Sequence, residues 1–134
     1  MEPKPKAKIL FLDDDKFILN VYGMKFTHAG YELRTAASVE DALNELRKGF
    51  RPDVIISDLV MAQASGFDFL DTLKTEHLAQ GAYRIVLTNQ EGTLDKVQTQ
   101  ELGVDRYIVK VTMTPDEVVA AVDQVVTDRK TIKK

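Results

Sequence analysis

The chain has 134 residues, the usual length of one globular domain, and ordinary shares of apolar (44%) and charged (29%) residues. It contains no cysteine, which excludes disulfide bonds and thiolate metal ligands, and no apolar run near the ~18 residues needed to span a membrane. The net charge of −3 is uneven, because residues 1–8 and 129–134 hold seven of the 18 basic residues but one of the 21 acidic residues. The acidic remainder argues against direct binding of nucleic acid.

These features predict a single domain over residues 1–134, with a core from about residue 7 to residue 127 and a short basic tail at each end. The N-terminal residues lead directly into a strand-like segment, which argues against a signal peptide. We therefore expect a cytoplasmic protein with no membrane association.

Five short segments have the length and apolar content of strands, and they alternate with longer amphipathic segments. The expected strands cover residues 9–12, 31–36, 54–57, 84–87 and 106–109. The runs "ILFL", "VII" and "RIVL" within them are almost continuously apolar, which is typical of strands covered on both faces of a parallel sheet.

The first two helices carry clear start or stop signals. The first is expected over residues 15–29, with its N-cap at Asp15. The apolar side that we expect to face the core consists of Phe17, Ile18, Val21 and Met24. The second helix begins after Ser38, a suitable N-cap with Asp41 three residues later, and stops at Gly49.

The last two helices differ in the strength of their signals. Residues 93–102 are mostly polar, which predicts a loosely packed helix or a movable element. The apolar residues that this segment offers to a core are Leu94, Val97 and Leu102. The final helix starts with a capping box, in which Thr114 is the N-cap, Pro115 the first helical residue and Glu117 the partner. Its expected core-facing residues are Val118, Val122 and Val125.

This alternation predicts an α/β fold, a doubly wound (βα)5 arrangement of five parallel strands with right-handed crossovers and helices on both faces of the sheet. Polar side chains follow four of the strands: Asp13 and Asp14 end the first, Asp58 the third, Thr88 the fourth and Lys110 the fifth. Ligands bind at this edge of open parallel sheets. If the first, third, fourth and fifth strands are neighbours about 4.8 Å apart, the five side chains converge on one patch.

Three carboxylates in one pocket need a cation if all are to stay ionised, and oxygen ligands without histidine or cysteine suit Mg²⁺ (or Mn²⁺). A carboxylate in such a pocket can accept a phosphoryl group, whose charge the metal ion, a hydroxyl and an ammonium would offset.

With these motifs, the sequence resembles the receiver domain of two-component response regulators, and the single-domain chemotaxis regulators are similar in size. "FLDDD" resembles the acidic pair of that family, "VIISDLVM" its phosphoacceptor strand, "VLTNQ" its switch threonine, and "DRYIVK" its switch aromatic residue and lysine. Gly66, eight residues after Asp58, also has the spacing of the family. The resemblance covers roughly residues 7–127 and implies a flavodoxin-like sheet with strand order 2-1-3-4-5.

The resemblance implies that Asp58 accepts a phosphoryl group from a phosphohistidine of a sensor histidine kinase or phosphotransfer protein. Asp14, Asp58 and the backbone carbonyl of Val60 would bind Mg²⁺ directly, and Asp13 would bind it through water.

It also implies a switch, in which Thr88 and Lys110 contact the phosphoryl group and Tyr107 rotates inward as Thr88 moves. The face formed by the fourth helix, the fifth strand and the fifth helix would then change its preference for an unknown downstream protein. A phosphorylation-dependent homodimer through these helices is compatible with the resemblance, although no clear apolar stripe supports it. The chain would be a signalling protein and not an enzyme, catalysing only its own phosphorylation and dephosphorylation.

Several positions depart from the family pattern. Ala62 stands where the family usually has proline. The family also usually has proline after the lysine that corresponds to Lys110, often joined to it by a cis peptide bond, and here that position is Val111. A cis bond before a non-proline residue costs about 2.5–4 kcal/mol, so we expect a trans bond or visible strain before Val111. Val60, Asn89 and Gln90 flank the site. The apolar Val60 cannot orient an attacking water and Asn89 narrows access, which predicts a comparatively long-lived phosphoryl group.

Other interpretations fit parts of the sequence. The altered flanks are compatible with a receiver that works as a binding module without phosphorylation. A haloacid-dehalogenase-like phosphatase would share a D-x-D pattern with Asp13 and Asp15, but Lys16 follows it and no acidic pair follows a later strand. A flavodoxin-like FMN protein would need a phosphate-binding loop where the aspartates stand, and their charge would repel the flavin phosphate.

Overall fold

The computed structural model of the chain describes residues 4–61, 65–89 and 92–132. Five parallel strands form one sheet in the order β2-β1-β3-β4-β5, which confirms the predicted fold class and strand order. The strands are β1 (Lys8–Leu12), β2 (Glu32–Ala36), β3 (Val54–Ser57), β4 (Tyr83–Thr88) and β5 (Arg106–Val109). The helices are α1 (Lys16–His28), α2 (Val39–Arg47), α3 (Gly66–Thr75), α4 (Thr93–Glu101) and α5 (Pro115–Ile132), with a 3₁₀ turn, η1 (Lys110–Thr112), before the last.

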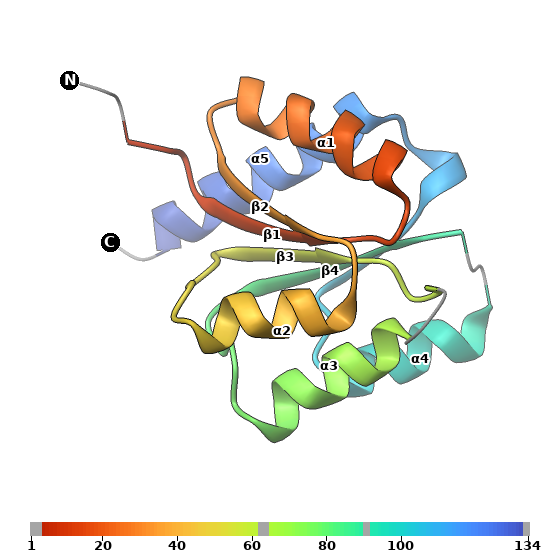
Figure 1. Cartoon of the computed structure of the whole chain (residues 1–134). Coiled ribbons are helices and arrows are strands. Elements are labelled where there is room, and N and C mark those ends of the chain that lie inside the picture. Colours follow the sequence, from red (N-terminus) through yellow and green to blue (C-terminus); the bar gives the residue numbers. More distant parts are fainter. Residues whose placement is uncertain (1–3, 62–64, 90–91, 133–134) are drawn as a thin grey trace.

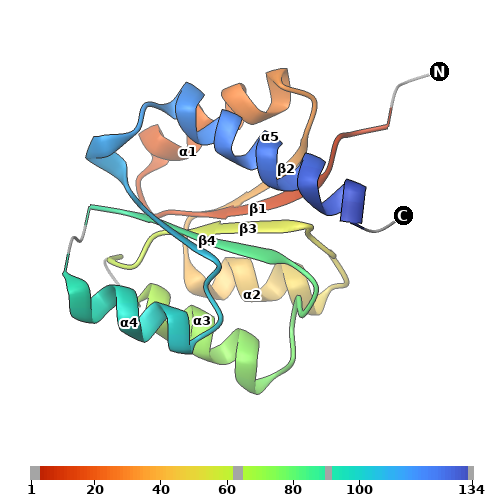
Figure 2. The same ribbon diagram turned by 180° about the vertical axis from the view of Figure 1, so that it is seen from behind.

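Helices cover both faces of the sheet. Figure 1 shows α1 and α5 on one face and α2, α3 and α4 on the other, and Figure 2 shows the same layers from behind. Each face has its own apolar cluster, one under α1 and α5 and one under α2 and α3. None of the helices in the described part of the chain is long and apolar enough to cross a membrane.

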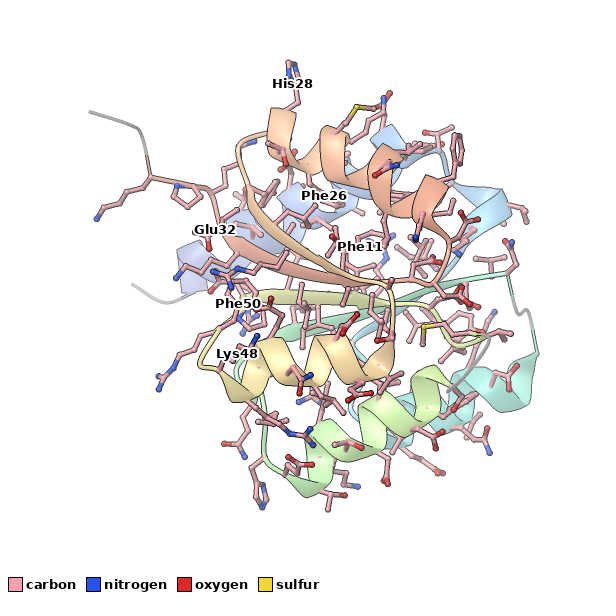
Figure 3. All side chains as sticks on the ribbon, in the orientation of Figure 1. Phe11, Phe26, His28, Glu32, Lys48 and Phe50 are labelled. Carbon is pink, nitrogen blue, oxygen red and sulfur yellow. The ribbon has the colours of Figure 1, made fainter. Side chains whose placement is uncertain are left out.

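The central strands are buried on both faces, as their continuous apolar runs predict. In β1, Ile9 and Phe11 join the cluster under α1, while Leu10 and Leu12 join the cluster on the other side. Phe11 and Phe26 lie between the sheet and α1 (Figure 3), with ring centroids 6.4 Å apart. After the exposed Lys8, β1 therefore has no polar side chain until the chain passes its end.

The predicted caps are present. The Asp15 carboxylate accepts hydrogen bonds from the first turn of α1, and the Ser38 hydroxyl accepts one from the Asp41 N–H at the start of α2. Thr114 and Glu117 form a reciprocal capping box at α5, with N···O distances of 3.0 and 3.2 Å. These local signals therefore define where the helices begin.

The predicted core-facing side of α1 was wrong for Phe17 and Met24, whereas Ile18 is half-buried against the cluster under α1 and α5. Phe17 and Met24 are 73% and 69% exposed. The buried residues of the helix are instead Leu19, Tyr22 and Phe26. Apolar residues occupy two sides of α1. The orientation of the helix on β1 and β2 decides which side is buried, and the spacing of apolar residues in the sequence does not reveal that orientation.

Smaller differences occur in the later helices. Val126 is buried in α5, whereas the predicted Val125 is only partly buried. In α4 the predicted Val97 is 45% exposed, and the buried residue among those described is Thr99, whose hydroxyl donates to a carbonyl of its own helix. Leu102, just after the helix, is half-buried against the cluster under α2 and α3, and the side chain of the predicted Leu94 lies outside the described residues.

The C-terminal ends of β1, β3, β4 and β5 lie at one edge of the sheet. Parallel pairing sets Leu12 beside Ser57, and Thr88 beside Val109. The next residues of each chain segment leave the sheet at this edge, opposite the start of β1 and the end of α5 (Figure 1). The polar residues predicted to follow the strands are therefore delivered to one place.

Candidate functional site

Three charged side chains meet at this edge. The Lys110 ammonium, just after β5, lies 2.8 Å from Asp13 Oδ2 and 2.9 Å from Asp58 Oδ2, so it bridges carboxylates that follow β1 and β3. The side chains of Asp13, Asp58 and Lys110 are 2%, 10% and 16% exposed. The fold thus brings together residues 97 and 52 positions apart in sequence, and the bridge keeps two buried carboxylates from facing each other unpaired.

The two oxygens of Asp58 have different partners. Oδ1 accepts a hydrogen bond from the backbone N–H of Leu59 at 2.7 Å and a longer one from that of Val60 at 3.4 Å. Oδ2 accepts from Lys110. The backbone therefore holds Oδ1 in place, while Oδ2 faces the ammonium group of Lys110.

Asp13 is held in a similar way, with Oδ1 accepting from the Asp15 N–H at 2.9 Å and Oδ2 from Lys110. Burial raises the pKa of Asp13, although its hydrogen bonds to Lys110 and to the Asp15 backbone act in the opposite direction. Burial alone would lower the pKa of Lys110, but its two carboxylate partners outweigh that effect and raise it. Lys110 therefore stays charged at neutral pH, and its ammonium does not fully offset the burial of Asp13.

The other predicted residues at this edge are placed differently. Thr88 is buried at the end of β4. Asp14 is exposed beside Asp13, and Asp15 serves as the cap of α1.

Val60 is an exposed apolar residue and Asn89 is also exposed, whereas Gln90 and Ala62 lie outside the described residues. The bond before Val111 is trans, since no described residue has a cis bond.

Within the ranges that the structure describes, no three acidic or histidine side chains are gathered closely enough to form a ready metal site. The donor set nevertheless suits a hard cation, because carboxylate oxygens converge here and neither histidine nor cysteine takes part. Burial, more than the charge of Asp58, raises the pKa of Asp13, so its charged form is less stable here than in water. A divalent cation would stabilise that charged form, so the residues fit Mg²⁺.

Tyr107 lies next to this site on the α4 side of the sheet. It pairs with Val86 of β4 and packs, half-buried, against the cluster under α2 and α3. Its partner Val86 lies two positions before Thr88 in β4, so the side chains of Tyr107 and Thr88 lie on the same face of the sheet. The Lys96 ammonium of α4 stands 5.7 Å from the centre of the Tyr107 ring, which is cation–π distance. Burial raises the pKa of Tyr107, and the charges of nearby aspartates add to this.

One feature of the site, the Ser57 hydroxyl, was missed in the sequence analysis, and another, Gly66, was noted only for its spacing from Asp58. The buried Ser57 hydroxyl donates to the carbonyl of Asp58 at 2.9 Å. Gly66 packs so tightly that a Cβ built on it would stand 2.0 Å from the same carbonyl oxygen. The sequence signal for the first is a single hydroxyl in an otherwise apolar strand, "VIIS", and for the second a glycine opening a helix.

A cavity of about 740 Å³ occurs elsewhere and contains none of these residues. Residues around it include Arg84, Gly103 and Arg129. The Arg84 and Arg129 guanidinium groups donate to backbone carbonyls, and Glu101 and Asp105 also line the cavity. Because its charges are mixed and largely engaged, the cavity does not compete with the acidic pocket as a site for chemistry.

Comparisons with known proteins agree with the geometry. The sequence profile of the response regulator receiver domain matches residues 9–123. The probable transcriptional regulator ycf27 of Pyropia yezoensis is 32% identical over 120 residues, which are 90% of this chain and 47% of that protein. The chain spans about half the length of the curated relatives that it matches at this level.

Solved structures have the same fold. The chemotaxis protein CheY4 of Vibrio cholerae matches with a TM-score of 0.81 and 29% identity, covering 89% of this chain and 98% of that one. A CheY-like receiver domain protein from Methanospirillum hungatei matches with a TM-score of 0.84 and 21% identity, covering 96% and 98%. The second likeness, at its low identity, concerns the fold alone.

Proposed function

The chain belongs to the response regulator receiver domain family of two-component systems, and on that premise we propose that it is a phosphorylation-dependent switch with Asp58 as phosphoacceptor. The observation that carries this proposal is that the two oxygens of the Asp58 carboxylate have different partners. Oδ1 accepts a hydrogen bond from the Leu59 N–H, and Oδ2 accepts one from the Lys110 ammonium. The phosphatase and FMN-protein interpretations lose their support, since neither accounts for the family match.

In the proposed reaction, Asp58 Oδ2 attacks the phosphorus of a phosphohistidine on a sensor kinase or phosphotransfer protein. The new O–P bond forms as the P–N bond breaks, and the imidazole leaves with the electron pair of that bond and takes up a proton. Lys110 is within reach of the developing charge because it already contacts Oδ2 at 2.9 Å. Thr88, buried at the end of the next strand, is the hydroxyl donor that we assign to a phosphoryl oxygen.

Mg²⁺ would supply charge neutralisation for the phosphoryl oxygens. We assign its direct contacts to Asp14, Asp58 and the backbone carbonyl of Val60, and a water-mediated contact to Asp13. Asp13 and Asp58 are buried, so their charges are screened less than in bulk water, which would strengthen their interaction with the ion.

The output is proposed to run through Thr88 and Tyr107. Both lie on one face of the sheet, so a shift of Thr88 toward a phosphoryl group would open space for the Tyr107 ring to turn inward. That turn would alter the face formed by α4, β5 and α5, and with it the binding of a downstream protein or a second copy of the chain. The acidic surface argues against direct contact of this domain with nucleic acid.

We also propose a long-lived phosphoryl group. Val60 is exposed beside Asp58 and has no polar group with which to orient a hydrolytic water. The lifetime is measured as loss of phosphate from the phosphorylated protein, for the parent and for Val60→Asn. Faster loss in the variant supports the role of Val60, and equal rates would remove that residue from the explanation.

The proposal is tested by incubating the protein with Mg²⁺ and acetyl phosphate and measuring intact mass. The parent should gain one phosphoryl group and Asp58→Asn none. Asp71→Asn, which changes an exposed aspartate of α3, should behave as the parent. No gain by the parent, together with no spectral change on adding a beryllium fluoride complex in NMR, would favour a binding module regulated without phosphorylation.

A further inference from the structure

Four hydrogen bonds hold the backbone around Asp58. The Asp58 N–H donates to the Leu12 carbonyl at 3.0 Å, and the Leu59 carbonyl accepts from the Gly66 N–H at 2.8 Å. Between these anchors lies the peptide unit that joins Asp58 to Leu59. Its carbonyl accepts from the Ser57 hydroxyl, and its N–H donates to Asp58 Oδ1 at 2.7 Å.

The carbonyl and the N–H belong to one rigid plane, because the peptide bond does not rotate freely. Holding the carbonyl oxygen therefore also fixes the direction of the N–H at the other end of the plane. That N–H is the group that engages Oδ1 and leaves Oδ2 toward Lys110. We infer that Ser57 is a positioning residue for phosphoryl transfer, acting through this peptide on the Asp58 carboxylate.

The chemistry of the strand supports a role beyond packing. Every other residue of β3 is apolar and buried, and Ser57 is buried among them at 1% exposure. A hydroxyl at such a position is costly unless it is bonded, and an alanine would fill nearly the same space without that cost. The hydroxyl is therefore matched to its acceptor, the Asp58 carbonyl.

The start of α3 leaves no space for another side chain to hold the Asp58 carbonyl in place of the Ser57 hydroxyl. The Asp58 carbonyl is crowded by the start of α3, where a Cβ on Gly66 would stand 2.0 Å from its oxygen. The peptide is thus held by a hydrogen bond on one side and by close packing on the other. Removing the hydroxyl leaves the packing but loosens the angular position of the plane.

The inference rests on the proposed function, and its test compares Ser57→Ala and Ser57→Thr with the parent. Ile55→Val is the control, since it weakens the packing of the same strand without touching the Asp58 peptide. Phosphorylation by acetyl phosphate with Mg²⁺ is followed over a range of donor concentrations. The Leu59 amide resonance is followed by NMR in the absence of donor.

We expect Ser57→Ala to lower the maximal phosphorylation rate about three- to tenfold, as loss of one hydrogen bond in the reacting geometry would, with little change in half-saturating donor concentration. The Leu59 amide resonance should move upfield as its bond to Oδ1 weakens. Ser57→Thr should restore both, and Ile55→Val should change neither beyond its effect on stability.

The outcomes separate the two proposals. If the parent accepts no phosphoryl group, both the proposed function and the role of Ser57 fail. If the parent is phosphorylated and Ser57→Ala keeps its maximal rate and its Leu59 resonance, only the role of Ser57 is overturned. A rate loss in Ile55→Val equal to that in Ser57→Ala would likewise reduce Ser57 to a stabilising residue.

Discussion

Replacing Gly66 by alanine is expected to disturb Asp58 more than the fold as a whole. A Cβ at this position would stand 2.0 Å from the Asp58 carbonyl oxygen and 2.8 Å from Leu59 Cα, both backbone atoms. Since Cβ atoms essentially never come within 3.0 Å of other atoms, either α3 or the Asp58 peptide must move by about 1 Å. No side-chain rotation can relieve the clash.

The size of the effect follows from two opposing terms. Overpacking of this kind costs about 1–3 kcal/mol, and the gain from replacing glycine by alanine offsets about 0.4–1 kcal/mol of it. We therefore expect a net loss of about 1–2 kcal/mol in the free energy of unfolding, or a fall in Tm of roughly 3–10 °C. A shift of the acceptor carboxylate by about 1 Å can lower the rate of its reaction up to ~10²-fold.

Two measurements check this expectation, urea unfolding and the rate of phosphorylation by acetyl phosphate. Gly81→Ala is the matched control, because a Cβ there has no atom within 4 Å. The control should be as stable as the parent or slightly more so, and equally reactive. Parent-like stability and reactivity in Gly66→Ala would show that α3 yields without moving Asp58, and would refute the reasoning.

Three further changes probe other parts of the structure. Tyr31→Phe removes the hydrogen bond to Asp123 and should cost about 1–2 kcal/mol at pH 7. Burial, and to a smaller extent Asp123, raises the pKa of Tyr31 in the folded state. The tyrosine therefore ionises first in the unfolded chain, and its contribution to stability is lost as pH rises above 10. A stability difference between the parent and Tyr31→Phe that stays constant in urea unfolding from pH 7 to pH 11 would contradict this. Thr114→Ala should cost about 1 kcal/mol through loss of the capping box, and unchanged thermal unfolding would argue against it. Lys110→Met leaves the Asp13 and Asp58 carboxylates without their ammonium partner. It should lower the free energy of unfolding by roughly 2–3 kcal/mol in metal-free buffer, and adding Mg²⁺ should recover part of this stability. An equal loss of stability with and without Mg²⁺ would speak against a cation in the pocket.

Much of the fold could be predicted because its signals are local. The strand run of Val54–Ser57 matches its predicted bounds, and the caps at Asp15, Ser38 and Thr114 lie where short side chains precede helical periods. Each signal depends on residues within about one turn of one another, so it can be read without knowing the fold. The strand order, in contrast, came only from the resemblance to a family.

The first helix shows where local reasoning ends. Phe17 and Met24 have the right spacing for a core face, but so do Leu19, Tyr22 and Phe26, and only the second set is buried. A helical period states which residues share a side. It does not state which side meets the sheet, because that depends on the crossing of α1 over its neighbours.

The candidate site divides in the same way. By itself the sequence determined that Asp13, Asp58 and Lys110 follow strand ends, because an apolar run that stops at a charge is visible in one dimension. Only the tertiary structure decided that one ammonium lies between two carboxylates and that α3 leaves no room for a Cβ against the Asp58 carbonyl. Those contacts depend on distances of about 3 Å or less between separate segments, and such distances are set by the packing of strands and helices in three dimensions.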